Sequence, residues 1–135
     1  MGVIIPFKNM KCALIGQRST QKEKDLMWRL FQNVEDLISR GYNNFYVGNE
    51  EGFDTLALQC LNNLKETHNF EITLFDKDKI DPYHISLRNE RMIDNCDYIL
   101  ALWDGEFGET CTAIDYCREK DKNILIIFAK LEYVV

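Results

Sequence analysis

The sequence predicts a three-layer α/β architecture, with a doubly wound parallel sheet of about five strands between two layers of helices. Short, almost entirely apolar runs alternate along the chain with longer segments whose apolar residues recur at helical spacing. The apolar runs lack the alternation of a half-exposed strand, which indicates that both faces of the sheet are covered. At 135 residues the chain is long enough for one hydrophobic core, so we expect a single domain over residues 1–135.

The apolar runs locate the strands. They are residues 10–16 (MKCALIG), 44–48 (NFYVG), 70–75 (FEITLF), 97–102 and 123–129 (NILIIFA). With a strand order of 3-2-1-4-5, the first and fourth strands are neighbours where the order changes direction. Ligands of such sheets bind beyond the carboxyl ends of the strands at that point, so we expect a crevice there.

The helical segments fall between these runs. The first has seven apolar residues at helical spacing from Leu26 to Ile38, and Gly41 closes it. The second begins near Gly52, and the fourth covers residues 110–120. Between the third and fourth strands, residues 76–85 are polar and broken by a proline, after which Ser86 has the character of an N-cap for a short helix.

Composition excludes several function classes. The formal net charge is -6, and no basic run is longer than a pair, which argues against nucleic acid as a partner. The five cysteines are odd in number and show no C-x-x-C spacing, so we expect reduced, mostly buried thiols and neither a disulfide framework nor a zinc site. We expect no metal and no cofactor. No apolar stretch reaches the length of a membrane span, and a cytoplasmic location is expected.

Residues 103–110 (WDGEFGET) form the most informative loop. Gly105 and Gly108 lie between an expected strand and an expected helix, where backbone N–H groups and the helix dipole favour phosphate. Glycines also occur in turns for conformation alone, so the loop is open to a purely structural interpretation. No nucleoside triphosphatase or dinucleotide motif is present. The loop after the first strand, residues 16–19, reaches the same expected crevice.

Two arginines strengthen the case for an anionic ligand. Arg88 and Arg91 lie one turn apart on the short helix before the fourth strand. Both are predicted to face the crevice, where a guanidinium can grip a phosphate or carboxylate with two hydrogen bonds. Surface arginines paired with Glu90 and Asp94 are the alternative.

Three segments in order, 52–57 (GFDTLA), 88–97 (RNERMIDNCD) and 104–110 (DGEFGET), carry a family resemblance. The chain resembles the SLOG superfamily, and most closely its small YspA-like and YpsA-like proteins, from Gly16 to about Phe128. This Rossmann-like superfamily also contains the LOG phosphoribohydrolases and the DNA-processing DprA proteins. The resemblance implies a nucleotide or nucleotide-derived ligand at the crevice, and a homodimer or higher homo-oligomer.

The resemblance also assigns residues. Arg88 matches the catalytic arginine of LOG enzymes, Asp54 matches the acidic residue of the GFD motif, and the glycine loop matches their phosphate loop. The candidate ligand-binding residues are Gly16, Gln17, Arg18, Ser19, Gly52, Asp54, Arg88, Asn89, Arg91, Trp103, Asp104, Gly105, Gly108, Glu109 and Thr110. Trp103 is a candidate for stacking on a base, with packing as the alternative.

One departure from the family pattern decides between binding and catalysis. Ala113 stands where LOG enzymes, and the nucleoside deoxyribosyltransferases that residues 96–127 also resemble, carry a glutamate. An alanine neither stabilises an oxocarbenium ion nor moves a proton. The leading hypothesis is therefore a sensor or sequestering module. The alternative is an N-glycosidic-bond enzyme of either kind, with Arg88, Glu109 and Asp115 as catalytic candidates.

A third hypothesis is a scaffold whose crevice is empty. It draws on a candidate subunit interface, for which we expect an exposed Trp28 together with Phe45, Tyr46 and the tail 131–135 (LEYVV). The same tail could instead add an edge strand to the sheet.

Overall fold

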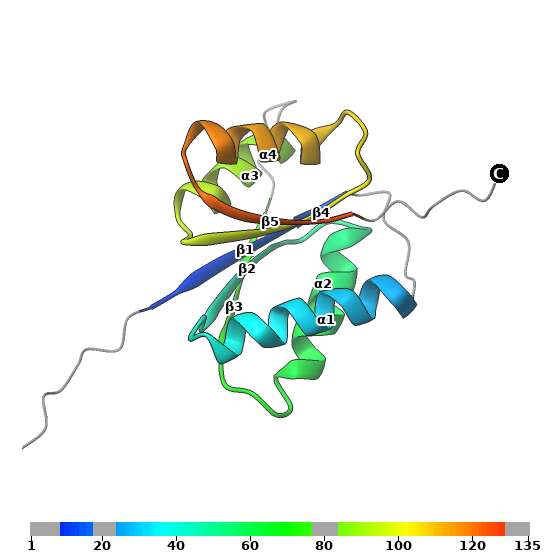
Figure 1. Cartoon of the computed structure of the whole chain (residues 1–135), viewed down its shortest axis with the longest axis vertical. Coiled ribbons are helices and arrows are strands. Elements are labelled where there is room, and N and C mark those ends of the chain that lie inside the picture. The colour runs from blue at the N-terminus through cyan, green and yellow to red at the C-terminus, as the bar shows by residue number, and fades with distance from the viewer. Residues whose placement is uncertain (1–8, 18–23, 77–83, 129–135) are drawn as a thin grey trace, which may run out of the picture.

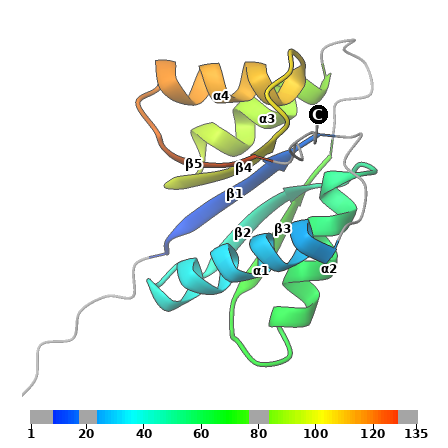
Figure 2. The ribbon, with the colours of Figure 1, turned by 45° about the vertical axis from the view of Figure 1, so that its right-hand side comes forward.

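The computed structural model describes residues 9–17, 24–76 and 84–128 and has the three-layer α/β architecture that the sequence predicts. Its elements are β1 (Lys11–Gly16), α1 (Lys24–Ser39), β2 (Asn44–Gly48), α2 (Phe53–Leu64), β3 (Glu71–Phe75), α3 (His84–Asp94), β4 (Tyr98–Trp103), α4 (Glu109–Glu119) and β5 (Asn123–Phe128). Figure 1 shows α1 and α2 on one side of the sheet, with α3 and α4 on the other. The turned view in Figure 2 shows the same layers. Within the described ranges, no helix is long and apolar enough to span a membrane.

The sheet has the order β3-β2-β1-β4-β5, as predicted, and every neighbouring pair is parallel. The two central strands, β1 and β4, pair with Gly16 beside Leu102 at their carboxyl ends. The chain runs from β1 to β2 and β3 on one side, and then returns to β4 and β5 on the other. This reversal places the carboxyl ends of β1 and β4 at the switch point of the sheet.

Two hydrophobic layers cover the sheet, one under α1 and α2 and one under α3 and α4. Consecutive β1 residues divide between them: Leu14 packs into the first layer and Ile15 into the second, and both are fully buried. Side chains of a strand alternate between its faces, so a strand covered on both sides is apolar throughout. This explains why the runs in the sequence lack a polar alternation.

Several element boundaries differ from the prediction by one to three residues, and three of these differences lie near the candidate site. Helix α3 begins at His84, so Ser86 lies within its first turn and is not its N-cap. Serine favours a cap but is tolerated in a helix, so its presence does not fix the start. Strand β4 extends one residue further, through Trp103, and α4 begins at Glu109 with Gly108 as its N-cap.

The predicted subunit interface is wrong in part. Trp28 is 58% exposed and stacks on Phe31, with 6.1 Å between the ring centroids. Phe45 and Tyr46, however, are buried between β2 and the helices because they point to opposite covered faces of the sheet. The tail 131–135 lies outside the described residues.

The cysteines have the expected character. All five are unpaired, and all except the half-buried Cys111 are buried. Burial raises the pKa of Cys60 to about 12 and the pKa of Cys96 to about 11. Thiols with such pKa values stay protonated at neutral pH, so these buried side chains act as small apolar groups and not as nucleophiles.

Candidate functional site

The carboxyl end of β1 packs directly against the start of α2. A Cβ atom on Gly16 would lie 2.2 Å from the Phe53 ring, so only glycine fits there. The Phe53 N–H donates to the Gln17 carbonyl at 3.2 Å, and Gly52 is the N-cap of α2 with a φ of 77°. Gly16 and Gln17 therefore contact the start of α2, where Gly52 is the N-cap. The predicted residues Arg18 and Ser19 lie outside the described residues.

A buried ion pair lies beyond the carboxyl end of β2. Arg88 from α3 and Asp54 from α2 are 2% and 3% exposed, and the Arg88 Nη1 donates to Asp54 Oδ2 at 2.9 Å. A Cβ atom on Gly48 would lie 1.9 Å from that Nη1 and 2.5 Å from that Oδ2. Gly48 thus makes room for the pair, a role that the sequence analysis missed although the strand visibly ends in glycine.

The Arg88 guanidinium is held on a second side as well. Asn89 Oδ1 accepts hydrogen bonds from Arg88 Nε at 3.3 Å and from Nη2 at 2.8 Å. Arg91, one turn later, is exposed and donates from Nη2 to the Asp76 carbonyl at 2.8 Å. The two arginines therefore have different surroundings, and Arg88 is already bound to protein groups.

The buried carboxylate of Asp54 lacks a hydrogen-bond donor for one of its two oxygens among the described residues. Its Oδ2 accepts from the Glu50 N–H at 3.0 Å as well as from Arg88, but the buried Oδ1 has no hydrogen-bond partner among the described residues. Burial raises the pKa of Asp54, and the Arg88 charge and the Glu50 N–H offset this only in part. A carboxylate in this position costs free energy because one of its oxygens has lost water without gaining a donor.

The loop after β4 is held in shape by its own side chains. The Trp103 Nε1–H donates to the Glu106 carbonyl, and the Glu106 N–H donates to Asp104 Oδ1, both at 2.8 Å. Gly105 and Gly108 have φ values of 88° and 152°, which favour glycine. The loop from Gly105 to Gly108 is exposed, so it presents a preformed backbone at the switch point.

The amino-terminal end of α4 has no side-chain cap. Gly108 is its N-cap, and the Thr112 N–H and hydroxyl both donate to the Gly108 carbonyl at 3.0 Å. The N–H groups of the first helical turn have no carbonyl one turn earlier in the helix to which they could donate. Together with the helix dipole, they give this end of α4 a partial positive charge that attracts anions.

A cavity of about 300 Å³ lies between α3 and α4. It is lined by Asn89, Glu90, Glu109, Thr112, Ala113, Asp115, Tyr116 and Glu119. Three predicted residues, Asn89, Glu109 and Asp115, thus come together around Ala113. Asn89 links this cavity to the ion pair because its Oδ1 holds Arg88.

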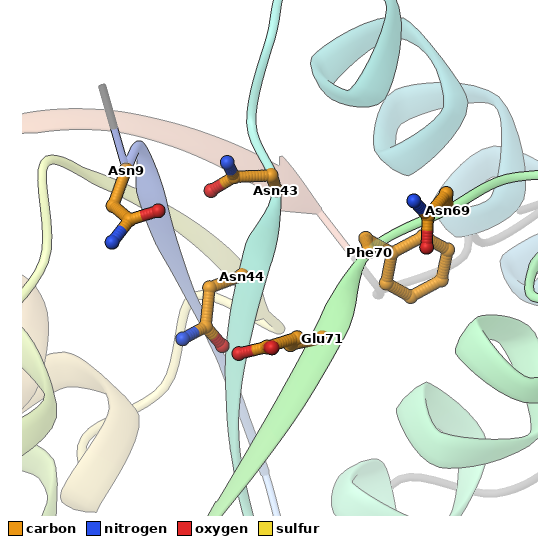
Figure 3. Close-up of a pocket in the computed structure, with 6 residues that line it drawn as sticks. All are labelled: Asn9, Asn43, Asn44, Asn69, Phe70 and Glu71. Atoms are coloured by element: carbon orange, nitrogen blue, oxygen red, sulfur yellow. The ribbon is translucent and has the colours of Figure 1, made fainter. Parts of the chain in front are cut away.

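A second cavity of similar size lies at the opposite, amino-terminal edge of the sheet (Figure 3). Asparagines dominate it, and their contacts explain their presence. Asn43 Oδ1 accepts from the Met10 N–H at 3.2 Å, and Asn44 Oδ1 accepts from the Thr73 hydroxyl at 3.0 Å. These amides tie the starts of β1, β2 and β3 together. Across the described parts of the chain, no group of three or more His, Cys, Asp or Glu side chains is arranged to hold a metal ion.

The parallel sheet of order β3-β2-β1-β4-β5 and the glycine loop after β4 define a Rossmann-like α/β protein. No protein-family model matches the chain, and no curated protein matches its sequence. Among solved structures, DNA processing protein A from Helicobacter pylori has a similar fold, with a TM-score of 0.64 at 16% identity over 91% of this chain and 67% of that one. That structure was described for its mode of binding single-stranded DNA. The likeness confirms the fold.

Proposed function

We propose that this protein binds a nucleotide or a nucleotide-derived molecule, with a phosphate at residues 105–110 and the first turn of α4. The observation that carries the proposal is the uncapped amino-terminal end of α4 at the switch point of the sheet. A phosphate oxygen accepts N–H hydrogen bonds and carries the negative charge that this end of the helix favours.

The loop supports the proposal because it is already in shape. Asp104 and Trp103 each bond to Glu106 within the loop, so a ligand would not have to order this backbone when it binds. Glycine at positions 105 and 108 leaves open space where a side chain would otherwise stand, since a Cβ atom at either would meet no atom within 4 Å. A ligand can therefore approach the backbone closely.

Arg88 has a supporting role in this proposal. Its guanidinium is buried and bound to Asp54 and Asn89, so we infer that it positions these two side chains and does not grip a phosphate as a free cation. Thr110 is also buried, one residue into α4, and its N–H belongs to the phosphate-binding turn.

The charge of the chain favours a small ligand over a long nucleic acid. A strand of DNA presents many phosphates and needs a surface rich in lysine and arginine. The net charge here is -6, Glu106 lies within the glycine loop, and Glu109 directly follows it. One or two phosphates fit such a surface better than a polymer does.

The test is to identify what the protein carries and where it binds. Small molecules released by denaturing freshly purified protein would be identified by mass spectrometry. AMP, ADP, ADP-ribose and a 12-nucleotide thymidine strand would then be titrated separately. Stoichiometric binding of a nucleotide, weakened when Gly108→Val blocks the approach to the loop, supports the proposal. Binding of the strand alone, or of none of the four, contradicts it.

A catalytic alternative draws on the cavity between α3 and α4. Glu109 and Asp115 line it beside Ala113, and hydrolysis of an N-glycosidic bond commonly needs two carboxyl groups, one as acid and one as base or nucleophile. We propose this activity as the second candidate. Free base released from AMP, and lost in both Glu109→Gln and Asp115→Asn, would support it. No release from AMP, dAMP, GMP or CMP would reject it.

A further inference from the structure

Strand β5 is one of the two edge strands of the described sheet, paired only with β4. Every second backbone N–H and C=O of an edge strand points away from the sheet, where it can pair with another strand. Folded proteins usually protect such edges with charged residues, prolines or bulges. The outer edge of β5 therefore shows whether this protein avoids further strand pairing.

The sequence of β5 contains none of these protective features. Residues 123–128 (NILIIF) include no charge, proline or glycine, and the strand pairs with β4 over its whole length without a bulge. Leu125 is 37% exposed and Phe128 is 53% exposed. In a protein with 28% charged residues, a six-residue uncharged edge with exposed apolar side chains is typical of a surface that is covered.

We propose that β5 pairs antiparallel with β5 of a second copy of this chain, joining the two sheets across a two-fold axis. A two-fold axis brings the same surface of both copies together, so the strand has to be complementary to itself. An uncharged strand meets this requirement, since no side chain of β5 faces a like charge in its partner.

The charged groups at the two ends of β5 favour this pairing. At the carboxyl end, Arg29 from α1 donates from Nη1 to the Phe128 carbonyl at 2.8 Å. At the amino end, the exposed Asp121 precedes the strand by two residues, and the neighbouring Lys122 is engaged with the Cys96 carbonyl. Antiparallel pairing brings the amino end of one strand to the carboxyl end of the other. Asp121 of each copy then approaches Arg29 of the other.

The opposite edge of the sheet lacks this complementarity. Strand β3 carries an exposed Glu71 at its amino end, and Asp76 directly follows its carboxyl end. Antiparallel pairing of two β3 strands would bring these carboxylates together, and like charges facing each other destabilise a strand pair. The two edges therefore predict different behaviour, with association at β5 and none at β3.

The size of the contact sets the expected strength. A stable interface usually buries about 1,200–2,000 Å² in total, and one pair of short strands with its flanking side chains falls at or below the lower end of that range. We therefore expect a dimer that dissociates on dilution in the micromolar range. Phe128 also packs on Trp103, with 5.9 Å between ring centroids, so the contact lies beside the loop after β4.

The test is sedimentation velocity of the full chain at concentrations from about 1 to 200 µM. Wild-type protein should shift from monomer to dimer over this range, and Leu125→Glu should remain monomeric because it places like charges opposite each other in the strand pair. Asp121→Lys and Arg29→Glu should each weaken dimerisation about fivefold to tenfold, as expected for two exposed ion pairs. The double variant Asp121→Lys/Arg29→Glu should restore it.

Leu74→Glu on β3 is the matched control, since Leu74 is also exposed on an edge strand. It should leave dimerisation unchanged, and circular dichroism would verify that every variant folds. A chain that is monomeric at all concentrations would overturn the proposal, as would a dimer that Leu125→Glu leaves intact. Failure of the double variant to recover would overturn the pairing of Asp121 with Arg29.

Discussion

Two polar regions lie at the carboxyl edge of the same sheet and differ in how their hydrogen bonds are used. Around Gly48, the side chains of Asp54, Arg88 and Asn89 are buried and bond to one another. Around Gly108, the backbone is exposed and the first turn of α4 has no side-chain cap. The side chains around Gly48 form hydrogen bonds within the protein, whereas the backbone N–H groups at the start of α4 are available to a ligand.

This difference separates stability from binding. A buried ion pair contributes chiefly by compensating charges that would otherwise be costly, so removing one partner disturbs the fold. An exposed loop and an open helix end contribute little to folding, and changes there should act mainly on a ligand. Each prediction below changes one region and compares its effect on unfolding with its effect on binding.

The largest effect is expected for Arg88→Ala. This change leaves the buried Asp54 carboxylate without its cation, which should reduce the free energy of unfolding by about 3–5 kcal/mol. Urea denaturation followed by circular dichroism measures this loss. Arg91→Ala is the control, since its exposed guanidinium bonds only to the Asp76 carbonyl among the contacts described, and it should cost less than about 1 kcal/mol. Equal stability of the two variants would contradict the claim that the buried ion pair around Gly48 stabilises the fold.

A somewhat smaller loss is expected for Gly48→Ala. The added methyl would lie 1.9 Å from Arg88 Nη1, so the ion pair has to move. Overpacking of this kind costs about 1–3 kcal/mol. Gly105→Ala provides the comparison, because a methyl there meets no atom within 4 Å and adds only backbone strain at a φ of 88°. The same denaturation experiment should rank Gly48→Ala as the more damaging change.

Glu109→Gln should change stability and binding in opposite directions. The carboxylate lies in the first turn of α4, where a negative charge stabilises the helix by about 0.3–1 kcal/mol. Removing it should lower stability by that amount. It should also tighten binding of AMP a few-fold, because a phosphate would no longer approach a like charge. Calorimetric titration measures the affinity, and weaker binding in this variant would count against a phosphate at the loop.

The smallest effect is a pH dependence from Asp54. Burial raises the pKa of Asp54 in the folded protein above its ordinary value of 3.8, so the folded state binds this proton more tightly than the unfolded state does. Its contribution to stability is therefore present below pH 3.8 and is lost as the pH rises through the folded pKa. Relative to Asp54→Asn, wild-type protein should lose stability as the pH increases from 4 to 7. A gain in stability over this pH range would show that the charge of Arg88 outweighs burial in setting the pKa of Asp54.

The sequence predicts most of the fold because the strands are apolar runs and the helices are amphipathic. Strand order and the position of the glycine loop follow from that pattern together with the rules for doubly wound sheets. The same pattern does not show which side chains pair with one another. Helix spacing makes Arg88 and Arg91 equivalent. The family resemblance singles out Arg88, but its pairing with Asp54 over Gly48 is visible only in the structure.

Other parts of the site need three-dimensional information for the same reason. The cavity around Ala113 forms between two successive helices that are joined through β4, and its lining depends on how α3 and α4 pack. Phe45 and Tyr46 look like interface aromatics in the sequence, but neighbouring residues of a fully covered strand are both buried. Gly48 was missed because a glycine at a strand end reveals a close approach only when the approaching group is known.

The most direct test of the central claim is a ¹⁵N–¹H NMR titration of the full chain with AMP. The proposal places the phosphate on the backbone N–H groups of α4, so the largest chemical-shift changes should fall on Glu109, Thr110 and Cys111 and disappear in Gly108→Val. The Arg88 side-chain signals should move little, because its guanidinium is already bound to protein groups. Large changes at Arg88 with none in the first turn of α4 would contradict the account.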